Sequence, residues 1–467
     1  MAVSHLETEY DICLQMWDTT GLIMKTTNDL IYGNETKAML SFAIPMIIGN
    51  LFQQLYNVAD SIIVGRFIGP SALAAVGSSF TVMVFLTSII LGLCMGSGAV
   101  FSFFYGAKET DNLKNSLFTS FCFIGIISLI INICALIFID EILSFIHIPA
   151  EVLVDTKAYI QIIFYGITFT SIYNYFAAVV RSMGNSIMPL IFLIISTVIN
   201  IVLDIIFVVP LDMGVKGAAY ATIIAQCFSG VGIAVYSFAK VPQIRLNRKH
   251  IYLDKNMIKK IANYSVLSSI QQSIMNFGIL MIQGLVNSFG VSVMAAFAAA
   301  VKIDNFAYMP VQDFGNAFST FIAQNKGAEK NERIRRGIRS AVKIITIYCV
   351  IISVLVLAFA KPLLHIFIDA KETEILHIGR QYLFIVASFY CLIGYLFMFY
   401  GLFRGIGKSG ISIVLTIVSL GTRVILAYAL SPVSSIGIAG IWWAIPIGWG
   451  LADIIGIIKV RSLLRTQ

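Results

Sequence analysis

The chain has 467 residues, of which 58% are hydrophobic and only 12% are charged, with a net charge of +8. Its mean hydropathy is +0.88. A soluble domain carries about 25% charged residues, so the composition excludes a soluble protein. A basic chain could suit nucleic acid, but here the basic residues lie in short stretches between apolar runs, which is typical of membrane proteins. We therefore expect a multi-pass membrane protein that contacts the lipid bilayer and binds no nucleic acid.

The first 37 residues differ from the rest of the chain. They mix acidic and apolar residues without a clear period, and they show no cleavable signal peptide. We expect residues 1–37 to form a cytoplasmic N-terminal tail, and the sequence leaves open whether the natural start is Met1 or Met24.

Twelve apolar runs follow, each near or above the roughly 20 residues that a helix needs to cross a bilayer. Their expected limits are 38–66, 73–105, 114–139, 152–181, 187–210, 216–239, 258–288, 292–325, 334–360, 375–404, 409–430 and 437–459. A hydrophilic linker at 241–257 separates residues 38–240 from residues 258–467. The predicted fold is all-α, with twelve transmembrane helices in two six-helix bundles.

Basic residues set the expected orientation. They crowd the central linker and the loop after the eighth span, which lie on one face when twelve spans are counted: Lys240, Arg245, Arg248, Lys249, Lys255, Lys259, Lys260, Lys326, Lys330, Arg333, Arg335, Arg336 and Arg339. The positive-inside rule makes this face cytoplasmic, together with both termini. We expect a monomer in the cell membrane.

The two halves of the chain repeat each other. Arg181, Gly184, Ser186, Gly214 and Gly217 recur 223 positions later as Arg404, Gly407, Ser409, Gly437 and Gly440. Upstream, Gly69, Ser71, Ala74, Ala75, Gly106 and Ala107 recur 221 positions later as Gly290, Ser292, Ala295, Ala296, Gly327 and Ala328. Such a duplication indicates a transporter of two equivalent bundles, related by a pseudo-twofold axis along the membrane normal.

Only the first half carries acids at certain membrane positions. Asp60, Asn200 and Asp204 lie in its apolar runs, where the second half has Met281, Arg423 and Ala427. Polar and charged groups at membrane depth are costly and mark functional sites. Counting along the expected helices brings Asp60, Asp204 and Thr222 into the same outer half of the bilayer, and Asn200 shares a helix face with Asp204.

These four side chains form an all-oxygen set suited to a proton or Na⁺. Other interpretations stay open: Asp60 as the polar end of a long helix, Asn200 as a helix-bridging amide, and Thr222 as a threonine bonded to its own backbone.

The second half has its own membrane-depth charges, Lys302, Asp304, Asp313 and Arg423. We expect an internal ion pair for Lys302, and we weigh whether Asp313 faces a central cavity and attracts cationic substrates. Polar contacts in that cavity are predicted for a small set of residues: Gln53, Tyr56, Asn57, Gln272, Asn276 and Asp313. The scattered cysteines and histidines indicate neither disulfide bonds nor a metal cluster.

The first helix resembles the signature of the multidrug and toxic compound extrusion (MATE) transporters, through Pro45, the run Tyr56–Asp60, Gly65, Gly69 and Ala74–Ala75. The stretch Arg181–Gly184, with Asn200, Asp204 and Gly214–Ala218, is similar to the helices that follow in that family. The resemblance implies a V-shaped fold and a cation-coupled antiporter that expels amphipathic, often cationic compounds. Asp60, Asn200, Asp204 and Thr222 match the cation site of the DinF-like branch, whereas no acids match the branch with a site in the seventh and tenth helices.

We therefore expect an antiporter driven by H⁺ or Na⁺, with no cofactor. The alternative is a flippase for lipids or lipid-linked oligosaccharides, against which the few buried basic residues argue. An enzyme is not expected, because no catalytic cluster such as HExxH is present.

Overall fold

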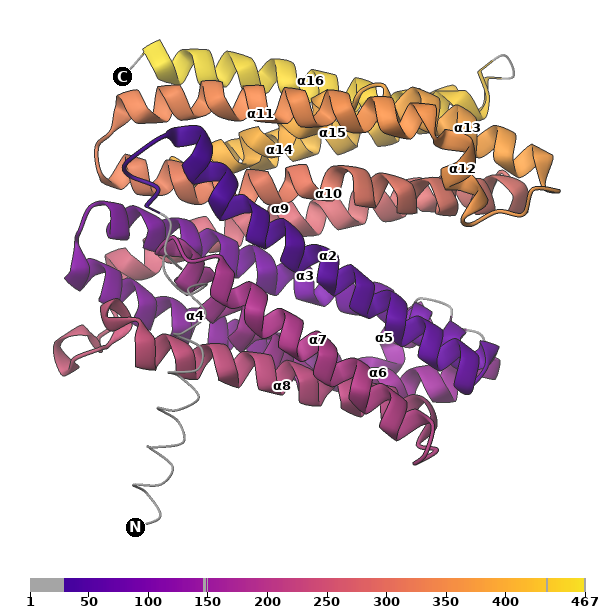
Figure 1. Ribbon diagram of the computed structural model, residues 1–467, viewed down its shortest axis with the longest axis horizontal. Helices are drawn as coiled ribbons and strands as arrows, with labels where there is room; N and C mark the ends of the chain where they lie inside the picture. Colours follow the sequence, from indigo (N-terminus) through magenta and orange to yellow (C-terminus); the bar gives the residue numbers. More distant parts are fainter. Residues whose placement is uncertain (1–28, 146–147, 149, 434–435, 466–467) are drawn as a thin grey trace.

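The structure, a computed structural model, describes residues 29–145, 148, 150–433 and 436–465 (Figure 1). The predicted tail up to residue 28, with Met1 and Met24, lies outside these ranges. Within them the chain is helical and contains no strand. Helices α2 to α8 form one layer in Figure 1 and helices α9 to α16 form the other. We call these layers the first and the second bundle.

The long helices follow the predicted spans closely. The first bundle contains α2 (Glu35–Phe67), α3 (Pro70–Gly106), α4 (Thr110–Ile137), α6 (Ala150–Ser182), α7 (Ile187–Val208) and α8 (Gly214–Lys240), with a short α5 (Ile139–Phe145). The second contains α9 (Lys255–Asn287), α10 (Val291–Gly327), α11 (Asn331–Ala358), α13 (Thr373–Ala387), α14 (Tyr390–Gly405), α15 (Ser409–Leu430) and α16 (Ile438–Arg465), with a short α12 (Ala360–His365). Two short 3₁₀ turns, Pro242–Ile244 and Arg248–His250, lie in the linker between the bundles.

Twelve spans are confirmed, with one change. Eleven helices of the described chain are long and apolar enough to cross a membrane, and α13 and α14 together make a twelfth that is bent by 53°. The span expected at 375–404 is thus present but bent, with a break at Ser388 and Phe389. The helices run on through Pro45, Pro310 and Pro446, so proline does not mark this break.

The duplicated glycines lie at a reciprocal contact between the bundles. A Cβ atom on Gly106 would overlap the backbone of Gln324, and one on Gly327 would overlap the backbone of Phe103. Phe103 and Gln324 are themselves counterparts at the shift of 221. A contact in which each partner repeats the other's role is what a twofold axis produces, so α3 and α10 meet about the predicted pseudo-twofold axis.

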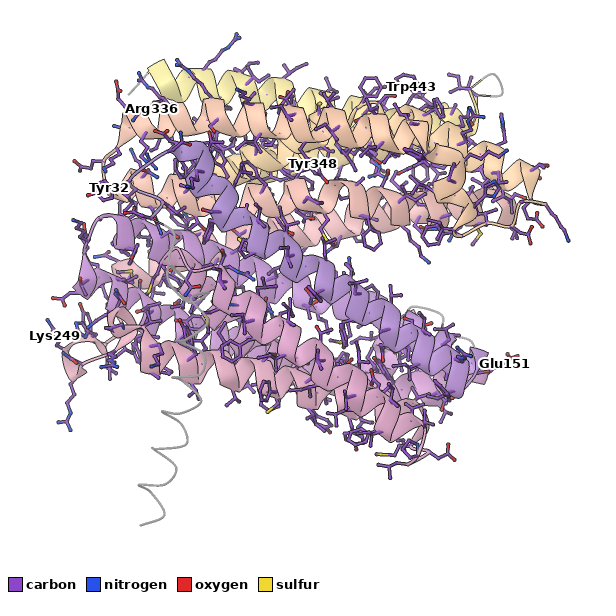
Figure 2. The ribbon with its side chains drawn as sticks, viewed as in Figure 1. Tyr32, Glu151, Lys249, Arg336, Tyr348 and Trp443 are labelled. Carbon is purple, nitrogen blue, oxygen red and sulfur yellow. The ribbon has the colours of Figure 1, made fainter. Side chains whose placement is uncertain are left out.

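Further close contacts hold the bundles together along α3. Gly92 and Gly96 lie against the backbone of Ser269 and Ser265 of α9, and the hydroxyl groups of Ser97 and Ser265 are 2.8 Å apart. We call the end of the molecule at which α3 and α10 finish the closed end. Figure 1 shows the two bundles diverging from it toward the end that carries α5 and α12. Lys249 and Arg336 lie at the closed end and Glu151 at the other (Figure 2).

Helix α2 belongs to both bundles. Near its start, Met39, Phe42 and Met46 are part of the buried core of the second bundle. Near its end, Ile63 and Val64 are part of a core formed with the first bundle. A boundary at residue 38 therefore assigns α2 to the first bundle by sequence, whereas the helix crosses from one bundle to the other (Figure 1).

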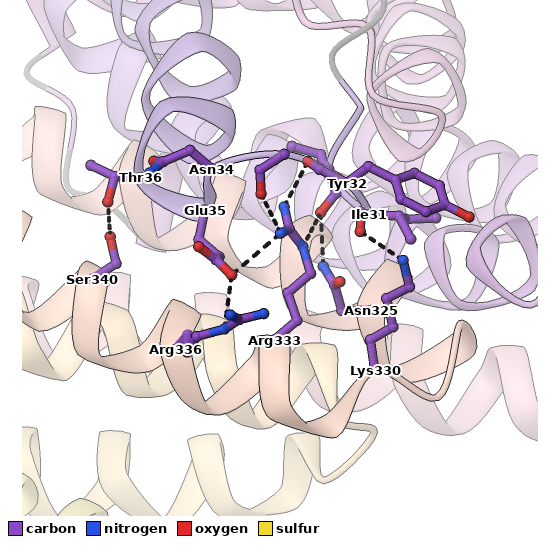
Figure 3. A network of polar contacts seen from close by, with 12 residues as sticks. Ile31, Tyr32, Asn34, Glu35, Thr36, Asn325, Lys330, Arg333, Arg336 and Ser340 are labelled. Atoms are coloured by element: carbon purple, nitrogen blue, oxygen red, sulfur yellow. Dashed lines mark hydrogen bonds and ion pairs between the residues drawn. The ribbon is translucent and has the colours of Figure 1, made fainter.

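A polar cluster fixes the segment that precedes α2 (Figure 3). Arg333 of α11 donates hydrogen bonds to the carbonyl groups of Leu30, Tyr32 and Gly33, at 3.3, 2.9 and 2.6 Å. Arg333 and Arg336 also lie 3.3 and 3.1 Å from the Glu35 carboxylate. Leu30, only 1% exposed, is buried in the core of the second bundle. We call this set the N-terminal clamp.

Removal of Arg333 should open the clamp. Arg333→Ala removes the donor to the Tyr32 and Gly33 carbonyl groups and one of the two basic partners of the partly buried Glu35, so we expect the free energy of unfolding to fall by about 3 kcal/mol. Thermal unfolding of the detergent-purified protein measures this effect. The matched control is Arg336→Ala. The Arg336 side chain is 63% exposed, so its removal should lower the free energy of unfolding by less than about 1 kcal/mol. Equal losses in the two variants would contradict the account.

The glycine contact gives a second prediction. Gly106→Ala places a methyl group against the Gln324 backbone, an overpacking that typically costs about 1–3 kcal/mol in the conformation described. Spin labels at the exposed positions Asn112 and Glu332 should therefore report a wider distance distribution across the closed end. Gly125→Ala on α4, where no atom lies within 4 Å of the new carbon, should leave that distribution unchanged. An unchanged distribution in Gly106→Ala would show that the bundles do not meet there.

Candidate cation site in the first bundle

Five polar side chains from four helices of the first bundle come together. Asp60 comes from α2, Tyr159 from α6, Asn200 and Asp204 from α7, and Thr222 from α8. All five are buried, and Asp204 is 0% exposed. The i, i+4 spacing on α7 directs Asn200 and Asp204 to the same neighbours. The four residues predicted from the sequence as a cation site therefore do lie side by side, although their role stays a prediction.

Hydrogen bonds connect these side chains. With its amide oriented to satisfy both ends, Asn200 donates to Asp204 Oδ2 at 3.0 Å and accepts from the Thr222 backbone N–H at 3.2 Å. The hydroxyl groups of Tyr56 and Thr222 are 3.2 Å apart. Since Tyr56 lies one turn before Asp60 on α2, this contact fixes the helix that carries Asp60 against α8.

The two carboxyl groups face each other without a counter-charge. Asp60 and Asp204 lie within hydrogen-bonding reach of one another. One oxygen of each, Oδ1, is buried and has no hydrogen-bond partner among the described residues. None of the ion pairs between described residues includes either carboxyl group. A hydrogen bond between two carboxyl groups requires a proton on one of them, so the geometry fits a site that holds a proton or a cation.

The donor set restricts which cation would fit. Two carboxylates, an amide oxygen and hydroxyl groups are hard oxygen donors, which suit Na⁺ rather than a transition metal. Across the described residues, no group of three or more His, Cys, Asp or Glu side chains is placed to hold a metal ion.

The residues predicted to line a central cavity differ in their exposure and in their contacts. Gln53 is exposed, whereas Tyr56 contacts Thr222 inside the first bundle. Asn57 donates to Gln54 at 3.2 Å. Gln272 is buried and Asn276 is half-buried on α9.

Asp313 differs from its predicted position. It is 3% exposed, and Asn50 of α2 donates to its carboxylate at 2.5 Å. Asp313 therefore bonds across the bundle interface in this conformation instead of facing a cavity. No local sequence pattern indicates this hydrogen bond, because Asn50 lies 263 positions away from Asp313.

The internal ion pair expected for Lys302 is wrong. Lys302 is exposed, and its Nζ lies 5.4 Å from the centre of the Phe367 ring. The buried charge of that segment is Asp304, which accepts hydrogen bonds from Tyr382 at 2.7 Å and from Tyr390. Lys302 and Asp304 are two positions apart, and side chains at that spacing point away from each other on a helix.

Two residues of the membrane interior were not predicted from the sequence. Tyr159 belongs to the acid cluster, where it interacts with Asp60, Asp204 and Thr222. Asp453 of α16 is 4% exposed, and both of its carboxyl oxygens are buried without a partner in the described chain. A search for charges inside apolar runs would have found Asp453, whereas a single tyrosine carries no such signal.

Comparison with known proteins agrees with this architecture. The MatE family model matches residues 45–206 and 265–429. The chain is 27% identical over 424 residues to the probable multidrug resistance protein YoeA of Bacillus subtilis, covering 89% of this chain and 91% of that protein. It is 24% identical over 432 residues to the multidrug export protein MepA of Staphylococcus haemolyticus, covering 91% and 93%.

Solved structures have the same fold. A MOP superfamily transporter from Pyrococcus furiosus, described as having a binding pocket of reverse polarity, superposes with a TM-score of 0.88 at 26% identity, over 93% of this chain and 97% of that one. A multidrug resistance MATE family transporter in an outward-facing conformation gives the same TM-score and identity, over 94% and 97%. The family model covers most of both repeats, so the chain belongs to the MatE family of membrane transporters.

Proposed function

We propose that the protein is an antiporter that exports amphipathic, often cationic compounds by alternating access, driven by H⁺ or Na⁺ bound at Asp60 and Asp204. One observation carries the proposal: two buried carboxyl groups face each other, and no ion pair between described residues includes either of them. Burial of uncompensated charge costs so much free energy that such a site takes up a proton or a cation. A driving ion therefore has a place to bind.

The distribution of charge supports an orientation. The closed end carries the basic linker with Lys249 and the basic start of α11 with Arg336, whereas Glu151 lies at the opposite end (Figure 2). By the positive-inside rule the closed end is cytoplasmic. The bundles then diverge toward the outside, as in the outward-facing relative. In this state, the acid pair would exchange ions with the external medium.

Helix α2 supplies the coupling. Its start packs in the core of the second bundle, and Asp60 near its end lies in the acid pair of the first. Binding of a cation between Asp60 and Asp204 pulls the two carboxyl groups together, and Tyr56 moves with Asp60 on the same helix. Asn50, two turns earlier, is bonded to Asp313 across the interface. The ion therefore acts on a helix that contacts both bundles, so ion binding and substrate binding compete, and uptake of the ion promotes release of the substrate.

The relatives support the substrate class. YoeA is named a probable multidrug resistance protein and MepA a multidrug export protein. Neither the proposal nor the site requires a cofactor. The DinF-like branch remains the assignment that the matched cation residues suggest.

The transport cycle can be tested in proteoliposomes. The purified protein is reconstituted with ethidium, an amphipathic cation, and a proton gradient or a sodium gradient is imposed separately. We expect one of the two gradients to drive ethidium against its concentration gradient, and ethidium to drive the same ion in return. Failure of both gradients, with a folded and inserted protein, would contradict antiport. Movement of a fluorescent lipid without any gradient would favour the flippase instead.

A nearly isosteric mutation of Asp204 tests the role of the acid pair. In Asp204→Asn, the new amide oxygen can still accept the hydrogen bond from Asn200, but one of the two carboxyl groups is lost. We expect gradient-driven ethidium transport to fall to the level of empty liposomes, with an unchanged elution profile in size-exclusion chromatography.

Asp212→Asn serves as the control for that mutation. Asp212 is an exposed acid after the end of α7, and asparagine tolerates its positive φ of 46°. Transport by this variant should match the wild type. Transport that survives in Asp204→Asn would place the driving ion elsewhere.

A further inference from the structure

The second bundle buries an acid that has no hydrogen-bond or ion-pair partner in the described chain. Asp453 of α16 is 4% exposed, and both of its carboxyl oxygens are buried without a hydrogen-bond partner. None of the ion pairs between described residues includes it. The other buried acids of the described second bundle differ, because Asp304 accepts hydrogen bonds from two tyrosines and Asp313 accepts one from Asn50. An unpaired buried carboxyl group is costly in a membrane protein and marks a functional site.

Two glycines of α16 bring neighbouring helices close on either side of Asp453. A Cβ atom on Gly448 would overlap the carbonyl oxygen of Ser419 on α15. A Cβ atom on Gly456 would overlap the ring of Phe399 on α14. Helix α16 is therefore packed closely on its neighbours both before and after Asp453, which accounts for the burial of this acid.

The hydroxyl groups of the facing helices are bonded elsewhere. Ser412 of α15 donates to the Tyr400 carbonyl oxygen at 3.4 Å, and Thr416 donates to the Ser412 carbonyl oxygen at 2.9 Å. Tyr382 of α13 donates its hydroxyl to a different acid. Tyr400 of α14 interacts with Asp453 electrostatically and is itself uncharged. These helices thus offer Asp453 polar neighbours but no hydrogen bond.

Two buried arginines of the facing helices also leave Asp453 unpaired. Arg404 of α14 donates to Asn316 of α10 at 3.1 Å, so its guanidinium group is directed to α10. Arg423 of α15 lies beside Gly448, whereas Asp453 lies five residues farther along α16, about 7.5 Å nearer the closed end. Neither arginine is in an ion pair with a described acid. The carboxyl group of Asp453 is therefore left without a balancing charge from either helix.

The repeat places no such acid in the first bundle. At the shift of 223, Asp453 corresponds to Gly230 of α8. A Cβ atom on Gly230 would overlap the carbonyl oxygen of Phe169 on α6, so the first bundle has no room for a side chain at this position. Asp453 is therefore a feature of the second bundle and not a requirement of the shared fold.

Asp453 also lies nearer the closed end than the acid pair does. Helix α16 ends at the closed end at Arg465, twelve residues or about 18 Å after Asp453 (Figure 1). Helix α7 begins at the same end, and Asp204 lies seventeen residues or about 26 Å after its start. The two sites thus belong to different bundles and lie at different depths.

From this arrangement we propose that Asp453 is a second ion site, which binds a proton in the conformation described and exchanges it with the cytoplasm when the closed end opens. A buried carboxylate without a counter-charge takes up a proton or a cation. A hard cation requires several oxygen ligands, whereas the hydroxyl groups of Ser412 and Thr416 are bonded to backbone carbonyl groups. The proton is therefore the ion that fits. The exchange step rests on the transport function proposed above.

A purely structural role does not account for Asp453. A side chain that makes no hydrogen bond and no ion pair adds nothing that an apolar side chain of similar size would not add, and its burial costs more. A carboxyl group differs from an apolar group in one useful property, which is that it can gain and lose a proton. Its position near the closed end then places that exchange on the cytoplasmic side.

Infrared spectroscopy tests the site without any transport. A protonated carboxyl group has a carbonyl stretching band that is separate from the bands of carboxylates and of the peptide bond. At neutral pH the wild-type protein should show a component of this band that Asp453→Asn lacks and that Asp453→Glu retains. Asp212→Asn, which changes an exposed acid, should leave the band unchanged. Asp453→Ala repeats the test if the asparagine variant does not fold. Identical bands in the wild type and in the folded Asn or Ala variant would overturn the proposal.

Counting protons tests the exchange. In proteoliposomes, a pH indicator and ethidium fluorescence together give the number of protons moved per ethidium. Asp453→Asn should halve this ratio if the acid pair uses H⁺, and should reduce it to zero if the acid pair uses Na⁺. Asp453→Glu should keep the wild-type ratio. A wild-type ratio in Asp453→Asn would show that the proton is held permanently, and it would overturn the exchange even if the infrared component is lost.

The two measurements separate this inference from the function on which it rests. If the wild type moves no ethidium against its concentration gradient, the proposed antiport fails. The infrared comparison of the wild type with Asp453→Asn then still decides whether Asp453 holds a proton.

Discussion

The uncompensated pair of acids in the first bundle is the constraint on which the rest of the structure depends. Asp60 and Asp204 are buried, face each other and have no basic partner in the described chain. In a medium of low dielectric constant, two such groups cannot both stay charged and empty. In the function that we propose, a proton or a cation from solution neutralises them. The free energy of the folded protein would then depend on an external ion.

Helix α2 connects the acid pair of the first bundle to the second bundle. The segment before it is held on the second bundle by the N-terminal clamp, and its first turns are buried there. Its last turns hold Asp60 against the first bundle. One rigid element thus connects the acid pair to the bundle interface at Asn50 and Asp313. Any shift of Asp60 relative to Asp204 must be absorbed along α2, because the clamp fixes its other end.

The sequence predicted the parts of this arrangement that depend on local pattern. Apolar runs gave the twelve spans, and the repeat together with depth counting brought Asp60, Asn200, Asp204 and Thr222 to one place. Features that depend on packing between distant segments were not accessible. The hydrogen bond between Asn50 and Asp313 joins residues far apart in the sequence. The helix break at Ser388 and Phe389 contains no proline or glycine that would predict it. Tyr159 joins the site as an ordinary membrane tyrosine, which no local pattern distinguishes.

The repeat also explains why the two bundles can differ in charge yet keep the same fold. Counterparts that carry the fold are small residues at backbone contacts, such as Gly106 and Gly327, and both copies must keep them because a side chain would overlap the other bundle. The polar clusters lie inside each bundle and do not form the contacts between bundles. Their residues can therefore differ between the two copies, provided that each buried charge is neutralised. In the second copy Arg423 and Ala427 stand where the first has Asn200 and Asp204, and the second bundle buries acids of its own, Asp304, Asp313 and Asp453. A single gene duplication thus permits the buried charges of the two bundles to diverge while the contacts between the bundles stay the same.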